Sequence, residues 1–451
     1  MHILKGYTKQ EISWMMYDWA NSAHSVIIVT LLPIFFDTVA GYTADSVSSM
    51  STWGYATSIA MLIVALAAPF LGVFGDIRGM RKKLFSFFML LGVAACAGMA
   101  FTPGMDFTSG PVAAGKVASL ILVLYIISVI GFDASAIYYD AFLTDVATED
   151  RMDKVSTMGY GLGYIGGSTI PLLIFLIMNL VGVPMLTCLA FVFGLTAVWW
   201  LAFSLPLLKN CEQTSGKPYE KGDVARSIKG VGTTIKEIIA NKPMLIYILS
   251  YFFYIDGVHT VISMATTYGT NLGLDSTGMM LALLLVQILG LPFCLLYIKC
   301  SEKFGARTMV GFGICVYMFI CIFAFFMNSL WQFWVLAVLC ATSQGGIQAL
   351  SRSMYGKLIP DKDRSGEFFG FFDIFGKFSS IMGRLWSALS AVWWQMECWG
   401  PGADRSDRNG GADRCDQRPV QPLRHFVHHY YHHCGRGAVL RFLPKAEHAK
   451  Q

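Results

Sequence analysis

The sequence predicts an all-α membrane protein that crosses the bilayer many times and is built from two similar halves. Hydrophobic residues make up 55% of the 451 residues and charged residues only 14%, whereas soluble domains carry about 25% charged residues. Apolar runs of about 20 residues, long enough to cross a bilayer core, recur along nearly the whole chain. A charged turn at residues 72–83 has a counterpart at 302–307. Such repetition is typical of transporter folds built from repeated halves.

Window length and low charge predict eleven membrane spans. They cover residues 14–38, 52–75, 84–102, 117–139, 157–179, 185–207, 244–268, 278–298, 308–327, 331–351 and 367–395. The first six spans form an N-terminal bundle within residues 1–208, and residues 209–243 form a polar linker. The other five spans form a C-terminal bundle within residues 244–396. Each charged turn then lies between the second and third spans of its bundle.

Lysine and arginine are concentrated in alternate loops. The first charged turn carries Arg78, Arg81, Lys82 and Lys83, and the linker carries seven more basic residues. The loops of the opposite side carry only Lys116 before the last span. Basic loops stay in the cytoplasm, so we expect the N-terminus, the linker and both charged turns there. The membrane would be the cell membrane of a bacterium or the vacuolar membrane of a fungus.

Polar side chains inside the spans are candidates for a substrate or coupling pathway. A charge near the bilayer centre costs at least about 2.5–3.5 kcal/mol and usually faces the interior of the helix bundle. The candidates lie in spans 1, 4, 7 and 10, where several share one helical face. They are Asp18, Asn21, Ser22, Asp133, Asp256, His259, Gln344 and Gln348.

Some of these residues also have structural interpretations. Asp18 lies only a few residues into span 1, so it could face the cytoplasmic headgroups. Asp140 lies just past the predicted end of span 4, where a structural role is favoured. His259 could be a packing residue, and for His24 packing is the preferred interpretation.

A second set of candidates lies in the two charged turns and in span 11. The resemblance described below gives these residues a gating role on the cytoplasmic side. In span 11, an aspartate and a lysine four residues apart suit an ion pair within one helix, which would lower the cost of burying both. The gating candidates are Gly72, Asp76, Gly79, Arg81, Glu302, Gly305, Arg307, Asp373 and Lys377.

Four stretches resemble a known family of transporters. Gly72, Asp76 and Gly79 match the loop signature of the major facilitator superfamily, with Met80 in place of its usual arginine. Within that superfamily, residues 17–22 (Tyr-Asp-Trp-Ala-Asn-Ser), 254–260 and 344–353 resemble the vacuole-effluxer-like branch. The resemblance covers about residues 10 to 383.

This resemblance implies a fold of twelve spans in two six-helix bundles that works by alternating access. It implies that Asp76 contacts the N-terminus of span 11 and a nearby arginine. The fungal members are linked to amino-acid efflux from vacuoles, so amino acids are the substrate class that the resemblance suggests. Asp18, Asp133 or Asp256 could then meet the substrate's ammonium group, or titrate if a proton is the coupling ion.

Other functions stay open at this point. The chain could export drugs or other metabolites, or be a membrane protein that transports nothing. The sequence has no nucleotide-binding loop and no catalytic constellation, so we expect neither a pump driven by ATP nor an enzyme. We expect a small-molecule substrate and the lipid bilayer as partners, with no cofactor, metal or nucleic acid.

The C-terminal stretch 397–451 departs from this pattern. The resemblance stops after Gly383, and Arg384 stands where a proline is expected. Residues 402–414 are too polar to span a membrane, and six histidines lie between His425 and His448. A metal site in this tail is disfavoured against an altered C-terminus that has replaced span 12. We therefore expect the last span to be missing or altered.

Overall fold

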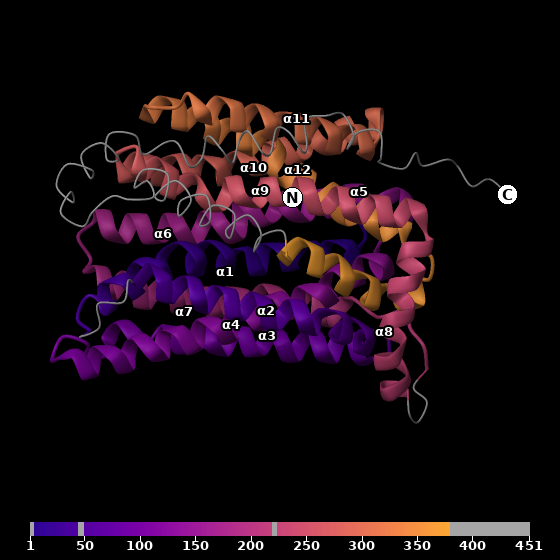
Figure 1. Cartoon of the computed structure of the whole chain (residues 1–451), viewed down its shortest axis with the longest axis horizontal. Helices are drawn as coiled ribbons and strands as arrows, with labels where there is room; N and C mark the ends of the chain where they lie inside the picture. Colours follow the sequence, from indigo (N-terminus) through magenta and orange to yellow (C-terminus); the bar gives the residue numbers. More distant parts are fainter. Residues whose placement is uncertain (1–3, 44–48, 219–222, 379–451) are drawn as a thin grey trace, which may run out of the picture.

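The computed structural model describes residues 4–43, 49–218 and 223–378, and its secondary-structure elements are helices (Figure 1). The α-helices are α1 (Lys9–Ala40), α2 (Ser49–Gly75), α3 (Met80–Met99), α4 (Pro111–Val146), α5 (Glu149–Leu162), α6 (Thr169–Leu180), α7 (Met185–Asn210), α8 (Asp223–Ala240), α9 (Lys242–Asn271), α10 (Ser276–Phe304), α11 (Ala306–Phe325) and α12 (Leu330–Leu358). A π-helical turn (Gly163–Ser168) joins α5 to α6. Short 3-10 turns lie at Thr102–Gly104 and Lys362–Arg364, and a further helix begins at residue 365 and is described to 378.

Within the described residues, ten helices are long and apolar enough to cross a membrane, and they correspond to the first ten predicted spans. One of them, Glu149–Leu180, consists of α5, the π-helical turn and α6. The predicted eleventh span, 367–395, is helical to residue 378, and the rest of it lies outside the described residues. The same is true of Arg384 and of the whole tail 397–451.

The helices extend beyond the predicted spans, because a hydropathy window stops where polar residues begin. In α4 this corrects one prediction. Asp140 does not lie past the end of its helix, since α4 continues to Val146. Asp133 and Asp140 are therefore two turns apart on one continuous helix, and the helix carries both carboxylates toward the rest of the bundle.

The buried side chains form two clusters. One draws mainly on residues 14–211 and the other mainly on residues 238–372. We call residues 9–210 the N-terminal half and residues 242–378 the C-terminal half. In Figure 1 most helices of the N-terminal half lie below those of the C-terminal half. Helix α5 packs against α1 of its own half and against α10 and α12 of the other, so it lies at the interface between the halves.

The linker contains a helix that the sequence analysis did not predict. Helix α8 (Asp223–Ala240) crosses one end of the bundle almost at right angles to the spans (Figure 1) and packs against α2 and α9. Its apolar residues recur every three or four positions, at Ile228, Val231, Ile235 and Ile238, which is the period of an amphipathic helix. Among them, Ile238 is buried.

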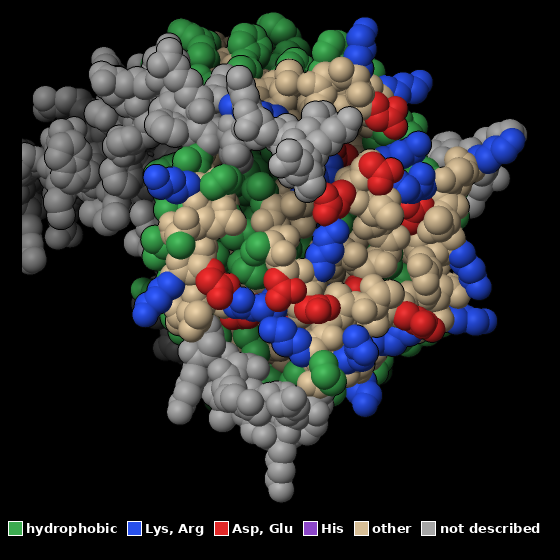
Figure 2. Space-filling view, turned by 90° about the vertical axis from the view of Figure 1, so that its right-hand side faces the viewer, with side chains coloured by type: hydrophobic (Ala, Val, Ile, Leu, Met, Phe, Trp, Pro, Cys, Tyr) green, Lys and Arg blue, Asp and Glu red, His purple; other side chains and the backbone are tan. Residues whose placement is uncertain are grey.

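Lysines, arginines and acids cover the end of the bundle that α8 crosses (Figure 2). We call it the charged end, and define it by the turns at residues 76–79, 147–148, 211–217 and 359–364. Positive and negative side chains are interspersed there rather than separated. The two halves meet at this end through the polar contacts described next.

Candidate functional site

Asp76 follows α2 and reaches the first turn of the helix that begins at residue 365. Its Oδ1 accepts the backbone N–H of Gly366 (2.7 Å), and its Oδ2 accepts that of Glu367 (2.8 Å). The first N–H groups of a helix have no partner within the helix and carry partial positive charge. Asp76 is 7% exposed. The contact implied by the family resemblance is therefore present, and it joins the two halves.

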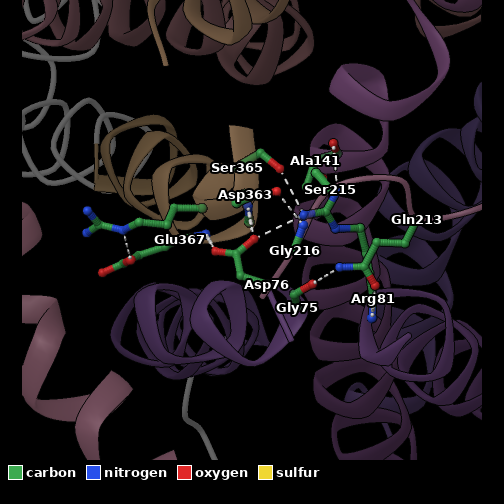
Figure 3. A network of polar contacts seen from close by, with 12 residues as sticks. Gly75, Asp76, Arg81, Ala141, Gln213, Ser215, Gly216, Asp363, Ser365 and Glu367 are labelled. Carbon is green, nitrogen blue, oxygen red and sulfur yellow. Dashed lines mark hydrogen bonds and ion pairs between the residues drawn. The ribbon is translucent and has the colours of Figure 1, made fainter. Parts of the chain in front are cut away.

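Arg81 lies fully buried beside this carboxylate (Figure 3). Its Nη2 donates to Asp76 Oδ1 (3.0 Å) and to Ser365 Oγ (2.8 Å), and its Nη1 donates to Asp145 Oδ2 (2.5 Å). Burial raises the pKa of the Asp76 carboxyl to about 7, although Arg81 and the two backbone N–H groups act in the opposite direction. The turn thus holds an enclosed ionic network between the halves.

Two predicted glycines serve this turn in different ways. A Cβ on Gly72 would lie 2.2 Å from the carbonyl oxygen of Gly366, so only glycine lets α2 approach the helix that begins at residue 365 so closely. Gly79 has φ +80°, a left-handed conformation that favours glycine. It ends the turn and precedes α3. Gly72 thus permits the contact between the halves, and Gly79 permits the turn that carries Asp76.

The second charged turn makes a weaker contact. Glu302 lies at the end of α10, 3.8 Å from Lys154 of α5, and both side chains are exposed. Gly305 has φ +83°, and Arg307, the second residue of α11, is half-buried. Each turn thus reaches the first part of a helix in the opposite half. Exposed ion pairs contribute little, so the predicted equivalence of the two turns does not extend to their burial.

Arg352 of α12 joins the halves at a second point. Its Nη2 lies 3.2 Å from Asp18 Oδ2 and its Nη1 lies 3.1 Å from Asp140 Oδ1, while its Nε donates to Ser156 Oγ at 3.0 Å. Arg352 is 4% exposed. Three aromatic rings lie 4.7–5.2 Å from its guanidinium carbon: Trp14, Tyr139 and Tyr160. Cation–π contacts of this kind stabilise a desolvated cation.

Lys377 forms a third contact between the halves. It pairs with Asp373 one turn earlier on its own helix, as the sequence predicted, and it also lies 3.6 Å from Asp133 Oδ1 of α4. Two carboxylates and one ammonium give this group a formal charge of −1. The group of Asp18, Asp140 and Arg352 has the same charge balance. Helix α4 contributes one carboxylate to each group.

The sequence of the chain is similar to those of known transporters. The model of the family described as "Vacuole effluxer Atg22 like" matches residues 40–152 and 144–391. The chain belongs to this family. The "uncharacterized MFS-type transporter YxiO" of Bacillus subtilis is 42% identical over 397 residues, which cover 86% of this chain and 90% of that protein. "Autophagy-related protein 22-1" of Penicillium rubens is 24% identical over 255 residues, 51% of this chain but only 43% of the fungal protein.

Solved structures establish the fold of this Atg22-like chain. The proton:xylose symporter XylE matches with a TM-score of 0.67 at 15% identity, over 97% of this chain and 95% of that one. The transporter FucP, in its outward conformation, matches with a TM-score of 0.61 at 12% identity, over 97% of this chain and 98% of that one. The protein is a multi-pass secondary transporter of the major facilitator superfamily and not an enzyme.

The other residues predicted for the pathway of this Atg22-like transporter are distributed over three helices. On α1, Ser22 packs closely against Gly163, since a Cβ added to Gly163 would lie only 2.5 Å from the Oγ of Ser22. The preceding residue, Asn21, is buried. Asp256 and His259 lie half-buried on α9, and Gln344 and Gln348 lie half-buried on α12. Ser22 therefore makes a packing contact between α1 and the π-helical turn, and the pathway roles of all six residues stay predictions.

His24 has the packing role favoured by the sequence. It is buried, stacks on Phe132 with ring centroids 4.7 Å apart, and lies 3.3 Å from Ser128. Asp18, by contrast, does not face solvent at the membrane surface, because Arg352 covers it. The headgroup interpretation of Asp18 was therefore wrong.

Sequence reasoning missed several members of these networks. Arg352 lies in the motif 344–353 but was not a candidate site residue, because its proximity to Asp18 and Asp140 arises only from the packing of the helices. Asp145 and Ser365 gave no signal either, because each lies at the end of a span where polar residues are common. Within the described residues, no group of three or more His, Cys, Asp or Glu side chains is arranged to hold a metal ion.

Proposed function

We propose that this transporter moves a small polar solute, of the amino-acid class, by alternating access of its two helix bundles. The bundles are residues 1–208 and the part of the chain that begins at residue 244, joined by linker 209–243. The observation that carries the proposal is the closure of the charged end. There the halves meet through Asp76, and Arg352 and Lys377 join them further inside the bundle. These polar contacts can break and re-form without exposing a hydrophobic core.

The charge balance between the halves supports a polar, positively charged group on the solute. The group formed by Asp133, Asp373 and Lys377 holds two carboxylates and one ammonium. An ammonium group of the solute, or a coupling proton, would bring this group to neutrality. The amino-acid class itself rests on the resemblance to the vacuole effluxers.

The charged end is proposed to face the cytoplasm of a bacterial cell. The basic residues of the linker and of the first charged turn support this orientation, and the Bacillus relative supports the cell membrane as the location. In this orientation, the closed charged end corresponds to a transporter shut toward the cytoplasm.

Counterflow in proteoliposomes tests the proposal. Vesicles with the purified protein are loaded with one unlabelled amino acid and given the same labelled compound outside, for each of the twenty in turn. We expect exchange of only some of the twenty amino acids, whose side chains share one chemical character. Asp133→Asn should lower that exchange at least about tenfold, because loss of a buried charge changes a barrier by more than ~1.4 kcal/mol.

Asp106→Asn is the matched control, since Asp106 is an exposed carboxylate in the turn between α3 and α4. It should exchange like wild type. Exchange of no amino acid by folded protein would contradict the substrate class and favour a drug or metabolite exporter. Equal exchange by Asp133→Asn and Asp106→Asn would contradict a pathway role for Asp133.

A further inference from the structure

The stretch that follows α7 is fastened to the first charged turn. The backbone N–H of Lys217 donates to the carbonyl of Asp76 (2.9 Å), and the N–H of Arg78 donates to the carbonyl of Lys217 (2.9 Å). These two bonds form a parallel β-bridge between Ile77 and Lys217. A linker that only joined the two halves would need no such pairing. We call residues 213–217 the linker segment.

Gln213 of the linker segment supplies a cap to α3. Its Oε1 accepts the N–H of Gly79 (2.8 Å) and that of Arg81 (3.3 Å), and its Nε2 donates to the carbonyl of Gly75 (3.0 Å). Gly79 stands at the N-cap of α3 and has no side chain to accept these bonds. The amide of Gln213 replaces the missing cap and thereby fixes the turn that presents Asp76.

Asp145 at the end of α4 holds the middle of the linker segment. Its Oδ1 accepts the backbone N–H and the hydroxyl of both Thr214 and Ser215, at 2.7–3.1 Å. Its Oδ2 accepts from Arg81, and Ser215 Oγ lies 3.2 Å from the same guanidinium nitrogen. Figure 3 shows Ser215 beside this guanidinium. The segment therefore fixes both the turn and the arginine that carry the contact with the other half.

Gly216 reaches across to the C-terminal half. Its backbone N–H donates to Asp363 Oδ1 at 2.8 Å. Its φ is +120°, and a Cβ there would lie 2.7 Å from both the carbonyl oxygen of Asp76 and Nε2 of Gln213. Only glycine fits this position, because both the backbone conformation and the space exclude a side chain.

We propose that the linker segment holds positioning residues of the gate. Gln213 and Ser215 set Arg81 and the charged turn for their contact with the C-terminal half, and Gly216 completes the closure by binding Asp363. Opening of the charged end then requires the Gly216–Asp363 bond to break. The proposal rests on alternating access as the proposed function, but it concerns the part of the chain between the halves.

A distance measurement across the charged end tests this. Spin labels are placed at Lys83→Cys on α3 and Lys303→Cys on α10, two exposed positions in opposite halves, in a chain without its other cysteines. Pulsed electron paramagnetic resonance then gives the proportions of short and long distances. We expect Gly216→Ala and Asp363→Ala to lower the ratio of closed to open molecules about threefold to tenfold, the effect of losing one hydrogen bond.

Two further variants separate positioning from general loss of structure. Ser215→Ala should increase the proportion of long distances but should melt at the same temperature as the control variant. Ser215→Thr should keep the wild-type distribution of distances, because threonine keeps the hydroxyl. The matched control is Glu212→Ala, an exposed neighbour just before the linker segment, which should change nothing.

The outcomes keep the two proposals apart. If Arg81→Gln, which removes the contact of Arg81 with Ser365, opens the charged end but Gly216→Ala, Asp363→Ala and Ser215→Ala do not, the linker segment is only a tether, and alternating access stands. If no variant and no condition produces the long distance, alternating access fails and the role of the segment fails with it. A shift in Glu212→Ala equal to that in Ser215→Ala also overturns the proposal.

Discussion

The guanidinium of Arg352 is almost wholly removed from water, yet both of its carboxylate partners come from the other half. Burying such a group costs free energy that its partners must offset. Two carboxylates share one cation, so neutralising either of them leaves Arg352 paired. Removing Arg352 itself leaves Asp18 and Asp140 buried without their counter-charge.

We therefore predict that Arg352→Gln destabilises the protein by about 3–5 kcal/mol, the usual effect of breaking a buried ion pair from one side. Thermal unfolding in detergent measures this loss. The control Lys116→Gln removes an exposed charge and should melt like wild type. Asp140→Asn added to Arg352→Gln should recover part of the loss. An unchanged melting temperature in Arg352→Gln would contradict the prediction.

Asp76 should make closure of the charged end depend on pH. Its pKa is raised to about 7 in the closed state, against about 3.9 for an exposed aspartate. The closed state thus binds the proton more tightly than an open state in which Asp76 meets water. Proton binding by Asp76 therefore stabilises the closed state relative to the open state. This stabilisation is fully present below about pH 4 and is lost as pH rises through about 7. Arg81, Asp145 and Glu367 are the charged groups around it.

We predict that the open fraction increases between pH 4 and pH 7, by at most about tenfold per unit. The spin-label distances across the charged end measure it. Asp76→Asn, which cannot titrate, should remove the increase that belongs to this residue. A pH response of the same size in wild type and Asp76→Asn would assign it to another group.

At the scale of helices, close approach depends on particular glycines. A Cβ on Gly131 of α4 would lie 2.4 Å from the backbone nitrogen of Gly92 in α3, whereas one on Gly115 of the same helix would meet nothing within 4 Å. Backbone atoms cannot move aside as a flexible side chain can. Contacts between small residues are typical of helix packing in membranes.

Gly131→Ala and Gly115→Ala are thus a matched pair on one helix. We predict that Gly131→Ala lowers the free energy of unfolding by about 1–3 kcal/mol through overpacking. Gly115→Ala should be neutral or stabilising by up to about 1 kcal/mol, because alanine favours the helix. Thermal unfolding of the two variants side by side tests this, and equal melting temperatures would show that α3 and α4 can separate without loss.

The sequence predicted the spans well because each one is a long apolar run, and the ten described spans all lie where such runs occur. It missed α8, whose apolar residues follow a helical period but do not form a run. It found Asp76, Asp373 and Lys377 from spacing and charge. It could not find the contacts of Arg81 with Asp145, Ser215 and Ser365, because residues this far apart in the chain meet only through the packing of the helices.

For the whole molecule, the orientation in the membrane is the main consequence of the charge distribution. We predict that the charged end faces the cytoplasm. A membrane-impermeant maleimide tests this in intact cells that carry one of two single-cysteine variants. Glu212→Cys lies at the charged end, and Ser109→Cys lies in the turn between α3 and α4. Ser109→Cys should react and Glu212→Cys should react only after lysis. The reverse pattern would place the charged end outside.

The π-helical turn Gly163–Ser168 divides one span into two parts whose surroundings differ in part. Both parts contact α1 and α10, but the part before the turn also packs against α12, and the part after it packs mainly against α7. A π turn holds one residue more than an α turn. Converting it to α geometry would rotate Thr169–Leu180 by about 100° and move it by about 1.5 Å along its axis. Such a conversion would change the residues that Thr169–Leu180 presents to its neighbours, while Glu149–Leu162 would keep its register.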